Sequence, residues 1–546
     1  MYRFASMLAI ALLPVVWLSA CGGNSVPELK KVEKKDVIVV ARGDKSEILD
    51  PHATNSGGDA YLIQQMYDTL VQPSAKPPVR WEPCLAESWK DEDFKVFTFN
   101  LRKGVKFHDG ADFNAAAAKR SFERGTNLKD PAAPPKLPYA EEYFGDIEKI
   151  EAVDDFTLRI TLKASNPKFI ASCGLFAASI VSPKAIAAME KEANAGARQN
   201  WLTRHPAGTG PYTIAKEGDY QGAETVIMTA FDGYWGGKAA TSRVVFNHDK
   251  DHKKRREQLT SGAVQLIDSP APEDWDLLSK DTGVTLYSWE AENLCYLGLN
   301  TDAANGFATS KLEVRQAIAY AIDREQMLTL YAGTAKAHHV LLPPVMIGHP
   351  AGYRPSTDTG SRAERLEKAR ALLKGAGVEK LELKLLHPAV SRPYLGKPPE
   401  VADFIRQQLA EIGITVKPEP TPMRELGDII SKGTAPMVLI GWMGETGEPD
   451  NFWTPLLSGR GKPSDNNVPR FWDKDVAAKV DAAAVERDIS KREAMYLELE
   501  KTVHEKFRPM VPLLTAKQAV AWRSEVEGIY VDSTGTYRLH KAHYKE

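Results

Sequence analysis

The first half of the chain has the hydrophobic pattern of short β-strands. Asp36–Arg42 is a run of β-branched residues that predicts a buried strand, whereas Phe97–Leu101 and Asp155–Leu162 alternate between apolar and polar residues and predict half-buried strands. The alternation stops at Lys103-Gly104 and resumes over Val105–Phe107, which is typical of a hairpin. We therefore expect this half of the chain to be rich in strands.

Helical spacing is found at two places in the same half. Ala60–Val71 has apolar residues three and four positions apart, which predicts an amphipathic helix. A second helix is expected from about Asn114, because an asparagine side chain can cap the first turn. The proline-rich segments Pro73–Pro83 and Pro131–Pro138 are expected to be loops.

The second half has a different pattern, in which helical spacing alternates with short apolar runs. Helices are predicted over Leu312–Leu328, Glu364–Leu373 and Val401–Ile412. Strands are predicted at Ile414–Val416 and Met437–Ile440. Alternating helices and strands indicate an α/β lobe with a mixed or largely parallel sheet. The chain is thus expected to contain two lobes, the first rich in strands and the second built from alternating helices and strands.

Length and charge narrow the class of protein. The 546 residues amount to three or four domains at about 150 residues each. Lys and Arg number 70 and Asp and Glu 72, so the net charge of −2 supplies no basic surface of the kind that nucleic-acid binding needs. We therefore expect no nucleic acid among the partners.

The N-terminus has the pattern of an export signal. Arg3 precedes Met7–Leu18, an uncharged apolar run that is too short to span a bilayer but fits the apolar region of a secretory signal. The run ends in Leu18-Ser19-Ala20-Cys21, which resembles a bacterial lipobox. The resemblance implies cleavage before Cys21 and attachment of lipid to its thiol.

The lipobox defines the expected limits of the mature chain. Residues 1–20 would be the lipoprotein signal peptide and residues 21–35 a polar tether. The protein would then lie in the cell envelope, at the periplasmic face of a membrane to which Cys21 anchors it. Ordinary signal cleavage nearby, which leaves a free soluble protein, is the alternative.

Three cysteines follow Cys21, and none of them forms a CxxC motif. They are Cys84, Cys173 and Cys295. An odd number allows at most one intramolecular disulfide, for which we favour Cys84 with Cys173. Three buried free thiols are the alternative.

The chain lacks the common catalytic and nucleotide-binding motifs. It contains no GxxxxGK[ST], HExxH, GxSxG or GxGxxG sequence. His248 and His252 are four residues apart and could bind a metal from one helical face, but Lys250 and Lys253–Arg256 beside them favour a solvated face. We therefore expect no metal, no other cofactor and no enzymatic activity. A periplasmic hydrolase, the alternative, would need a nucleophile or metal group that we do not find.

Six short segments mark the chain beyond its signal. They are Leu85–Trp89 (LAESW), Thr98–Gly110 (TFNLRKGVKFHDG), Gly208–Tyr212 (GTGPY), Tyr234–Gly237 (YWGG), Val314–Arg324 (VRQAIAYAIDR), and Gly441-Trp442 followed by Glu448–Phe452 (EPDNF). In this order and spacing they resemble the family 5 extracellular solute-binding proteins, the receptors of dipeptide and oligopeptide ABC importers. The resemblance covers nearly the whole chain after the signal.

The resemblance implies an α/β protein with the two-lobe periplasmic-binding-protein fold of class II, or Venus flytrap, and an extra β-rich subdomain in the first lobe. The passages between the lobes are expected near Cys295–Asn300 and near Pro512–Thr515. The implied division is lobe I over residues 36–297, with the subdomain inserted at about 81–204, lobe II over 298–513, and a C-terminal return to lobe I over 514–546.

The resemblance also implies where the two charged ends of a peptide bind. Glu445 takes the place of the family's aspartate that holds the ligand's ammonium group. Arg392, in the segment Arg392-Pro393-Tyr394, matches the arginine that holds the ligand's carboxylate. A planar guanidinium suits that task because it can bind a carboxylate through two parallel hydrogen bonds.

Further residues are expected at the ligand as neighbours of these two groups. Trp442 and Gly444 precede Glu445, and Tyr394 follows Arg392. In the first lobe, Asn55, Ser56 and Gly57 resemble the wall that offers backbone groups to the ligand. The tryptophan and the tyrosine are expected to pack in the lobe as well as to touch the ligand.

The implied partners are a short peptide and the permease subunits of an ABC importer in the inner membrane, with the receptor itself monomeric and touching the membrane only through its lipid. Glu445 is one methylene longer than the family's aspartate, which would shift the ammonium site or shrink the pocket. Members of the family also bind nickel chelates, haem and other small solutes. A receptor for one of those would favour His, Met or Arg in the cleft.

Overall fold

The structure is a computed structural model that describes residues 36–378, 380–459 and 461–546. The expected signal peptide, the tether and the lipidation site Cys21 lie outside the described residues. None of the described helices is long and apolar enough to cross a membrane.

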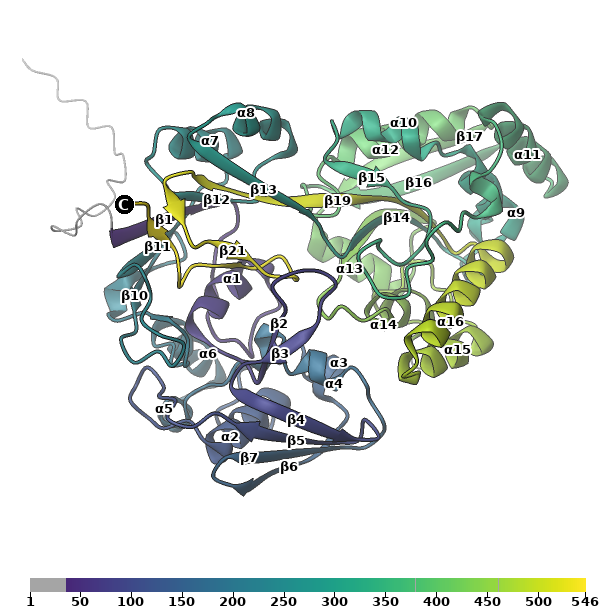
Figure 1. Cartoon of the computed structure of the whole chain (residues 1–546). Helices are drawn as coiled ribbons and strands as arrows, with labels where there is room; N and C mark the ends of the chain where they lie inside the picture. The colour runs from purple at the N-terminus through teal and green to yellow at the C-terminus, as the bar shows by residue number, and fades with distance from the viewer. Residues whose placement is uncertain (1–35, 379, 460) are drawn as a thin grey trace, which may run out of the picture. The chain divides into compact units, whose positions relative to one another are not determined.

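One large mixed sheet runs through the described chain (Figure 1). Along its main path the strand order is β17-β16-β18-β14-β19-β12-β1-β11-β10-β8. The strands of this path are β1 (Val37–Arg42), β8 (Tyr212–Thr213), β10 (Thr225–Ala230), β11 (Arg243–His248), β12 (Leu266–Asp268), β14 (Asn293–Leu299), β16 (Leu381–Pro388), β17 (Ile414–Thr421), β18 (Met437–Met443) and β19 (Met510–Arg523).

Shorter strands complete the sheet or form pairs of their own. The additional strands of the large sheet are β9 (Tyr220–Gln221), β13 (Val284–Glu290) and β15 (Ala335–Ala337). The separate pairs are β2 (Val71–Pro73) with β3 (Trp81–Pro83), β20 (Val526–Glu527) with β23 (His543–Tyr544), and β21 (Tyr530–Val531) with β22 (Tyr537–Arg538).

Two lobes meet at β19, and each has its own apolar core. In lobe I, β1 is parallel to β11 and β12, and Ile38 and Leu62 belong to one buried cluster. In lobe II, β16 is parallel to β17 and β18, and Leu385 and Leu439 belong to another. This confirms the α/β class and the mixed sheet expected from the sequence.

The helices lie outside the sheets and follow the expected spacing in most places. Those of lobe I are α1 (Gly57–Met66), α2 (Ala115–Thr126), α3 (Ala140–Phe144), α4 (Phe169–Ser172), α5 (Pro183–Met189), α6 (Ala195–Arg204), α7 (His252–Thr260) and α8 (Trp275–Lys280). Those of lobe II are α9 (Leu312–Ala321), α10 (Arg324–Met327), α11 (Arg362–Gly375), α12 (Pro398–Ala410), α13 (Met423–Lys432), α14 (Asp450–Trp453), α15 (Lys474–Val485) and α16 (Ile489–Thr502).

Two passages connect the lobes. Strand β13 pairs with β19 in lobe I, and β14 begins at Asn293 opposite Met443 in lobe II, so the first passage is Ala291-Glu292. The first passage was expected near Cys295–Asn300, but the segment from Cys295 belongs to β14, a strand buried over its whole length. The second passage is inside β19, whose first half pairs with β14 and whose second half pairs with β12 and β13.

The two passages are tied to each other by one buried asparagine. The side chain of Asn293 donates to the carbonyl oxygen of Ala516 at 2.6 Å and accepts from the N–H of the same residue at 2.8 Å. Asn293 is fully buried. The two passages of the chain between the lobes are therefore hydrogen-bonded to each other at one place.

A separate four-stranded sheet of order β4-β5-β7-β6 forms the β-rich subdomain of lobe I. Its strands are β4 (Ala86–Glu92), β5 (Val96–Leu101), β6 (Ile147–Asp154) and β7 (Thr157–Leu162). The alternation in β5 buries Phe97, Phe99 and Leu101 against α2 and its neighbours. As expected, Asn114 caps α2, accepting the N–H of Ala117 at 2.9 Å.

The hairpin expected after Leu101 is wrong. Strand β5 is central in its sheet and pairs with β4 on one edge and with β7 on the other, so neither edge is left for Val105–Phe107. That segment turns back on the residues that follow it. Lys106 bridges to Asp112, and the N–H of Phe113 donates to the carbonyl oxygen of Val105 at 3.0 Å.

One other expectation from local spacing needs correction, and the metal-binding alternative for His248 and His252 loses its basis. The single helix over Leu312–Leu328 is two helices, because Asp323 caps α10 by accepting the N–H of Gln326 at 3.1 Å. His248 and His252 do not share a helical face, since the first ends β11 and the second begins α7. Among the described residues no group of three or more His, Cys, Asp or Glu side chains could hold a metal ion.

The cysteines are three buried free thiols, which was the alternative to a disulfide. Cys84, Cys173 and Cys295 are free and buried, so the favoured Cys84–Cys173 disulfide is not formed. Burial raises the pKa of all three thiols. They are packing residues in apolar surroundings rather than reactive thiols.

Two buried ion pairs hold the loop that leads from β1 into α1. Arg124 and Asp50 have fully buried side chains, joined by a hydrogen bond of 2.9 Å from the guanidinium. At the start of the loop, Arg42 pairs with Asp268 at 2.7 Å and donates to the carbonyl oxygen of Gly58 at 2.9 Å. The start and the middle of the loop are thus fixed by ion pairs whose side chains are at most 9% exposed.

Removing one member of such a pair should be costly. Asp50→Ala leaves the Arg124 guanidinium buried without a counter-charge, and we expect the free energy of unfolding to fall by about 3–5 kcal/mol in chemical denaturation. The matched control is Glu382→Ala, which breaks an ion pair with Lys417 whose side chains are 59% and 66% exposed. The control should lose less than about 1 kcal/mol. Equal losses in the two variants would contradict this account of the loop.

Candidate functional site

Arg392 and Glu445 follow neighbouring strands of the lobe II sheet. Arg392 comes shortly after β16, and Glu445 comes two residues after β18. The two strands are parallel and hydrogen-bonded to each other. The carboxyl ends of parallel strands share one edge of a sheet, which is where α/β proteins bind their ligands. The two charged side chains expected from the sequence are therefore presented from the same edge.

The loop that carries Arg392 is tightly folded against the sheet. The backbone of Arg392 exchanges two hydrogen bonds with that of Leu395, at 3.0 and 2.9 Å. Tyr394 is buried, and a Cβ on Gly441 of β18 would lie 2.3 Å from its ring, so glycine is needed there. The loop after β16 is thereby seated directly on β18.

The guanidinium of Arg392 lies beside the hydroxyl of Tyr394. Burial raises the pKa of Tyr394, and the charge and hydrogen bond of Arg392 oppose that rise. The Nε–H of Arg392 is buried and has no hydrogen-bond partner among the described residues. The Nε1–H of Trp442, at the end of β18, is also buried without a partner in the described part of the chain. Unpaired donors of this kind are available to an acceptor that is not part of the protein.

Glu445 is held by two tyrosines from the opposite lobe. The hydroxyl of Tyr139 donates to Oε1 of Glu445 at 2.9 Å, and the hydroxyl of Tyr143 donates to Oε2 at 2.9 Å. Tyr139 and Tyr143 are one helical turn apart at α3, with ring centroids 5.2 Å from each other. Asn451 completes the group by donating to the Tyr143 hydroxyl at 3.1 Å and accepting the N–H of Glu445 at 3.1 Å.

These surroundings shift the pKa of the Glu445 carboxyl upward. Burial raises its pKa, and the hydrogen bonds from Tyr139 and Tyr143 oppose that rise because they stabilise the carboxylate. An ionised carboxylate offers about four acceptor positions, of which the two tyrosines use two. Glu445 can therefore accept further N–H donors while it stays bonded to both hydroxyls.

Other contacts join the same parts of the two lobes. The indole N–H of Trp81 donates to the carbonyl oxygen of Thr446 at 3.3 Å. Lys168 of lobe I forms an ion pair with the buried carboxylate of Asp450 on α14. Arg487 of lobe II pairs with Asp91 in strand β4 of the β-rich subdomain at 2.9 Å. Side chains of lobe I therefore contact the loop that contains Glu445 and the helix that follows it.

Gly444 lies directly against Glu292 in the first passage between the lobes. A Cβ at this position would lie 2.5 Å from Oε2 of Glu292 and 3.1 Å from the ring of Phe452. The residue is a glycine because no side chain fits between these two groups. Its role in the structure is to let the Glu445 loop approach Glu292.

Asn55, Ser56 and Gly57 are exposed and stand at the start of α1. A Cβ on Gly57 would meet no atom within 4 Å, so its backbone is open to its surroundings. The N–H of Ser56 donates to the hydroxyl of Thr54 at 3.0 Å, a hydrogen bond within lobe I. The structure joins Glu445 to α3 rather than to this segment.

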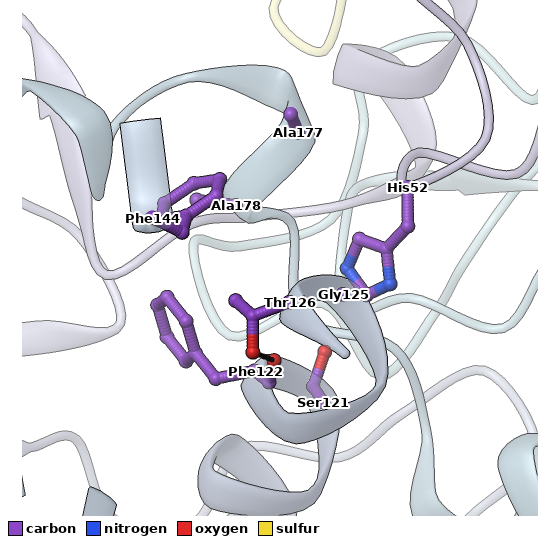
Figure 2. A pocket seen from close by; sticks show the side chains of 8 residues that line it. All are labelled: His52, Ser121, Phe122, Gly125, Thr126, Phe144, Ala177 and Ala178. Atoms are coloured by element: carbon purple, nitrogen blue, oxygen red, sulfur yellow. Dashed lines mark hydrogen bonds between the residues drawn. The ribbon is translucent and has the colours of Figure 1, made fainter. Parts of the chain in front are cut away.

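A small cavity in lobe I is not a place for a solute. Its volume is about 10 Å³, enough for about one water molecule, and it lies between α2 and the ring of His52 (Figure 2). Burial and the nearby Arg124 lower the pKa of His52 to about 4, so the ring is neutral. The lining residues are His52, Ser121, Phe122, Gly125, Thr126, Phe144, Ala177 and Ala178.

The tyrosines were missed in the sequence, although a signal was present. Tyr139 and Tyr143 are four residues apart in a short segment after a proline-rich loop, a spacing that puts both rings on one helical face. The spacing does not reveal that this face meets Glu445, which is about 300 residues away in the sequence.

Two α/β lobes joined by two passages, with oppositely charged side chains at the strand ends, define a solute-binding protein of the two-lobe type. The chain belongs to the family described as bacterial extracellular solute-binding proteins, family 5 Middle, whose family model matches residues 80–464. This confirms the resemblance that the six sequence segments indicated.

Individual relatives and a solved structure agree with the family. The chain is 30% identical to the dipeptide-binding protein of Escherichia coli (strain K12) over 474 residues, which cover 84% of this chain and 85% of that protein. It is 29% identical to the heme-binding protein A of Haemophilus influenzae (strain ATCC 51907 / DSM 11121 / KW20 / Rd) over 488 residues, 87% of this chain and 86% of that one.

The solved structure is that of the ABC transporter-associated periplasmic binding protein DppA from Helicobacter pylori in complex with the peptide STSA. It superposes with a TM-score of 0.78 at 28% identity and covers 93% of this chain and 98% of that chain. The two-lobe fold expected from the sequence is confirmed by this likeness.

The tyrosine contacts predict a measurable property of Glu445. Tyr139→Phe and Tyr143→Phe each remove a hydrogen bond that stabilises the carboxylate, so each should raise the pKa of Glu445, and the double variant should raise it further. The titration can be followed by ¹³C NMR of glutamate-labelled protein, with Glu445→Gln to assign the signal.

Tyr353→Phe is the matched control. It removes a hydrogen bond of 3.0 Å from a tyrosine to another carboxylate, that of Glu505. The pKa of Glu445 should not change in this variant. An unchanged Glu445 titration in both α3 variants would show that the tyrosines do not hold this carboxylate.

Proposed function

We propose that this chain is the substrate-binding receptor of an ABC importer, which captures short peptides between its two lobes and delivers them to permease subunits in the inner membrane. The single observation that carries the proposal is the placement of Glu445 and Arg392 at the ends of neighbouring parallel strands. A zwitterionic peptide needs one anionic and one cationic partner, and this edge offers both. The dipeptide-binding and peptide-complexed relatives support the same ligand class.

In this proposal Glu445 binds the ammonium group of the peptide. Its carboxylate is already orientated by Tyr139 and Tyr143 and keeps free acceptor positions. We infer that the extra methylene of glutamate, compared with the family's aspartate, lets the carboxylate reach the tyrosines of α3. We infer that the ammonium is recognised by a group to which both lobes contribute.

Arg392 binds the carboxylate of the peptide, and three residues around the two charges complete the site. The unpartnered Nε–H of Arg392 can donate to a carboxylate oxygen. Tyr394 fixes the guanidinium, Trp442 provides a second unpaired donor, and Gly444 allows the Glu445 loop its path. From lobe I, the open backbone at Asn55, Ser56 and Gly57 is proposed to supply the opposing wall.

Binding by both lobes explains how the ligand is sensed. A solute that contacts both sides favours the conformation in which they are close, by the difference between its affinities for the closed and open forms. The narrow junction at Ala291-Glu292 and β19 is the place about which the lobes would turn. The permease would then recognise the closed receptor. The role is binding rather than catalysis, as the family description indicates.

A haem or another small solute is the second candidate, because the heme-binding relative is as similar as the dipeptide-binding one. Native mass spectrometry of the purified protein separates the candidates. A bound mass of a short peptide supports the proposal, whereas a bound tetrapyrrole or metal chelate would replace it.

The carboxylate role of Arg392 can be measured directly. Arg392→Ala removes a charged hydrogen bond worth about 1.5–3 kcal/mol, so affinity for an equimolar dipeptide pool should fall about ten- to a hundredfold in calorimetry. Arg406→Ala, which removes an exposed arginine of α12, is the matched control and should leave the affinity unchanged. An affinity of Arg392→Ala equal to that of the wild type would rule out this role.

We also propose that Cys21 carries the lipid that holds the receptor at the periplasmic face of the membrane, where it acts as a monomer. Cys21→Ser removes the only thiol that the lipobox can modify. After fractionation of cells, this variant should leave the membrane fraction while the wild type stays in it. A variant that remains with the membrane would favour a different anchor.

A further inference from the structure

Glu292 is a buried carboxyl group on the first passage between the lobes. It lies between the end of β13 and the start of β14, and the residue is 8% exposed. The next residue, Asn293, pairs with Met443, the last residue of β18. Glu292 therefore stands beside the loop of residues 444–447, which contains Glu445.

Backbone and side chain of Glu292 both hold this loop. The N–H of Gly444 donates to the carbonyl oxygen of Glu292 at 2.5 Å, and the N–H of Gly447 donates to its Oε2 at 3.2 Å. A Cβ on Gly444 would lie 2.6 Å from the Cβ of Glu292, so the loop approaches as closely as a glycine permits. The two hydrogen bonds are placed on either side of Glu445 and fix both ends of its short segment.

The charged surroundings of Glu292 do not compensate an ionised carboxylate. Burial raises its pKa to about 7, the Gly447 N–H opposes the rise, and the like charge of Glu448 adds to it. Among the described residues no lysine or arginine forms an ion pair with Glu292. The other charged groups on the elements around it have their own partners, namely Glu290 with Lys336, Glu448 with Arg492, Asp450 with Lys168, and Glu445 with the two tyrosines.

We propose that Glu292 is a positioning residue of the ligand site, which holds the 444–447 loop and with it the Glu445 carboxylate, and whose protonation weakens capture of a cationic ligand group. The part that names the ligand's ammonium rests on the proposed function. The part that couples Glu292 to the loop does not, because it concerns contacts inside the protein.

The coupling has a simple physical basis. An ionised carboxylate accepts the Gly447 N–H more strongly than a protonated carboxyl does, so the loop is held best when Glu292 is charged. Its negative charge also adds to that of Glu445 near a ligand ammonium. Binding a cation therefore favours the ionised form, and affinity should rise as the pH passes upward through the pKa of Glu292.

The loop coupling can be tested without any ligand. Met443-Gly444 is the single Met-Gly pair in the sequence, so labelling methionine with ¹³C at the carbonyl and glycine with ¹⁵N isolates the Gly444 amide signal in the full mature chain. In the wild type this signal should shift with a midpoint near pH 7. In Glu292→Gln, which keeps the shape of the side chain but cannot ionise, that shift should vanish.

Glu445→Gln is the matched control, because Glu445 is next to Gly444 and could shift the same signal. The titration near pH 7 should persist in this variant. Equal titrations in the wild type and in Glu292→Gln, or no titration of the wild type between pH 5.5 and pH 8.5, about 1.5 units either side of the expected midpoint, would overturn the coupling. A comparison of Tm values guards against a misfolded variant.

The raised pKa of Glu292 also predicts the direction in which the Tm of Glu292→Gln should change. The pKa of Glu292 is higher in the folded chain than in a model peptide, so the folded state binds the extra proton and loses stability as the pH rises toward 7. Glu292→Gln should therefore raise the Tm at pH 8 and leave it nearly unchanged at pH 4. A variant that is less stable at both pH values would contradict a buried, uncompensated carboxylate.

The effect on capture is measured with the same dipeptide pool. Between pH 7 and pH 6 the affinity of the wild type should fall by up to about fivefold, as expected when the ligand prefers a form that titrates near pH 7. In Glu292→Gln the fall should be smaller. Identical pH profiles would overturn the effect on capture, whereas a pool that binds neither protein at any pH would refute the peptide ligand and leave the NMR result to decide the loop coupling.

Discussion

The arrangement of this protein depends on one strand that belongs to both lobes. Strand β19 pairs with β14 in its first half and with β12 and β13 in its second, so the two sheets share a continuous backbone. Asn293 bonds the other passage to the middle of that strand. Since these hydrogen bonds are buried and satisfied, any movement of one lobe relative to the other would have to be accommodated at this junction. The residues of the candidate site follow or precede strands that are joined through this junction, so their positions depend on it.

The location of the candidate site follows from where the parallel strands of lobe II end. The lobe II strands β16 and β18 deliver Arg392 and Glu445 to one edge, and the first passage delivers Glu292 to the same edge. In lobe I, buried ion pairs at Asp50 and Asp268 hold the loop before α1. Charge is thus used in two ways, as fully paired anchors that hold loops and as partly satisfied groups, which we propose as the binding site of a solute.

The sequence predicts the elements well where one hydrophobic period dominates. Strand β18 and helices α11 and α12 were expected close to their observed limits, because their apolar faces decide both their type and their extent. The hairpin after Leu101 failed because alternation predicts a strand but not its neighbours, and β5 has partners that are distant in sequence. For the site, the resemblance supplied Arg392 and Glu445, whereas the contact of Glu445 with Tyr139 joins residues about 300 positions apart, and Glu292 is buried against a loop about 150 positions away, neither of which local spacing can predict.

The bonds from Tyr139 and Tyr143 to Glu445 are made by the protein's own groups, and this bears on how selective a receptor of this kind can be. Part of the free energy that brings the lobes together is the same whichever solute is present. A weakly complementary solute and a strongly complementary one therefore share that contribution, and the ratio of their affinities depends only on the contacts that each makes for itself. A built-in contribution of this sort raises the affinity for every such solute by the same factor, so any discrimination between solutes has to come from the contacts that each solute makes with the protein.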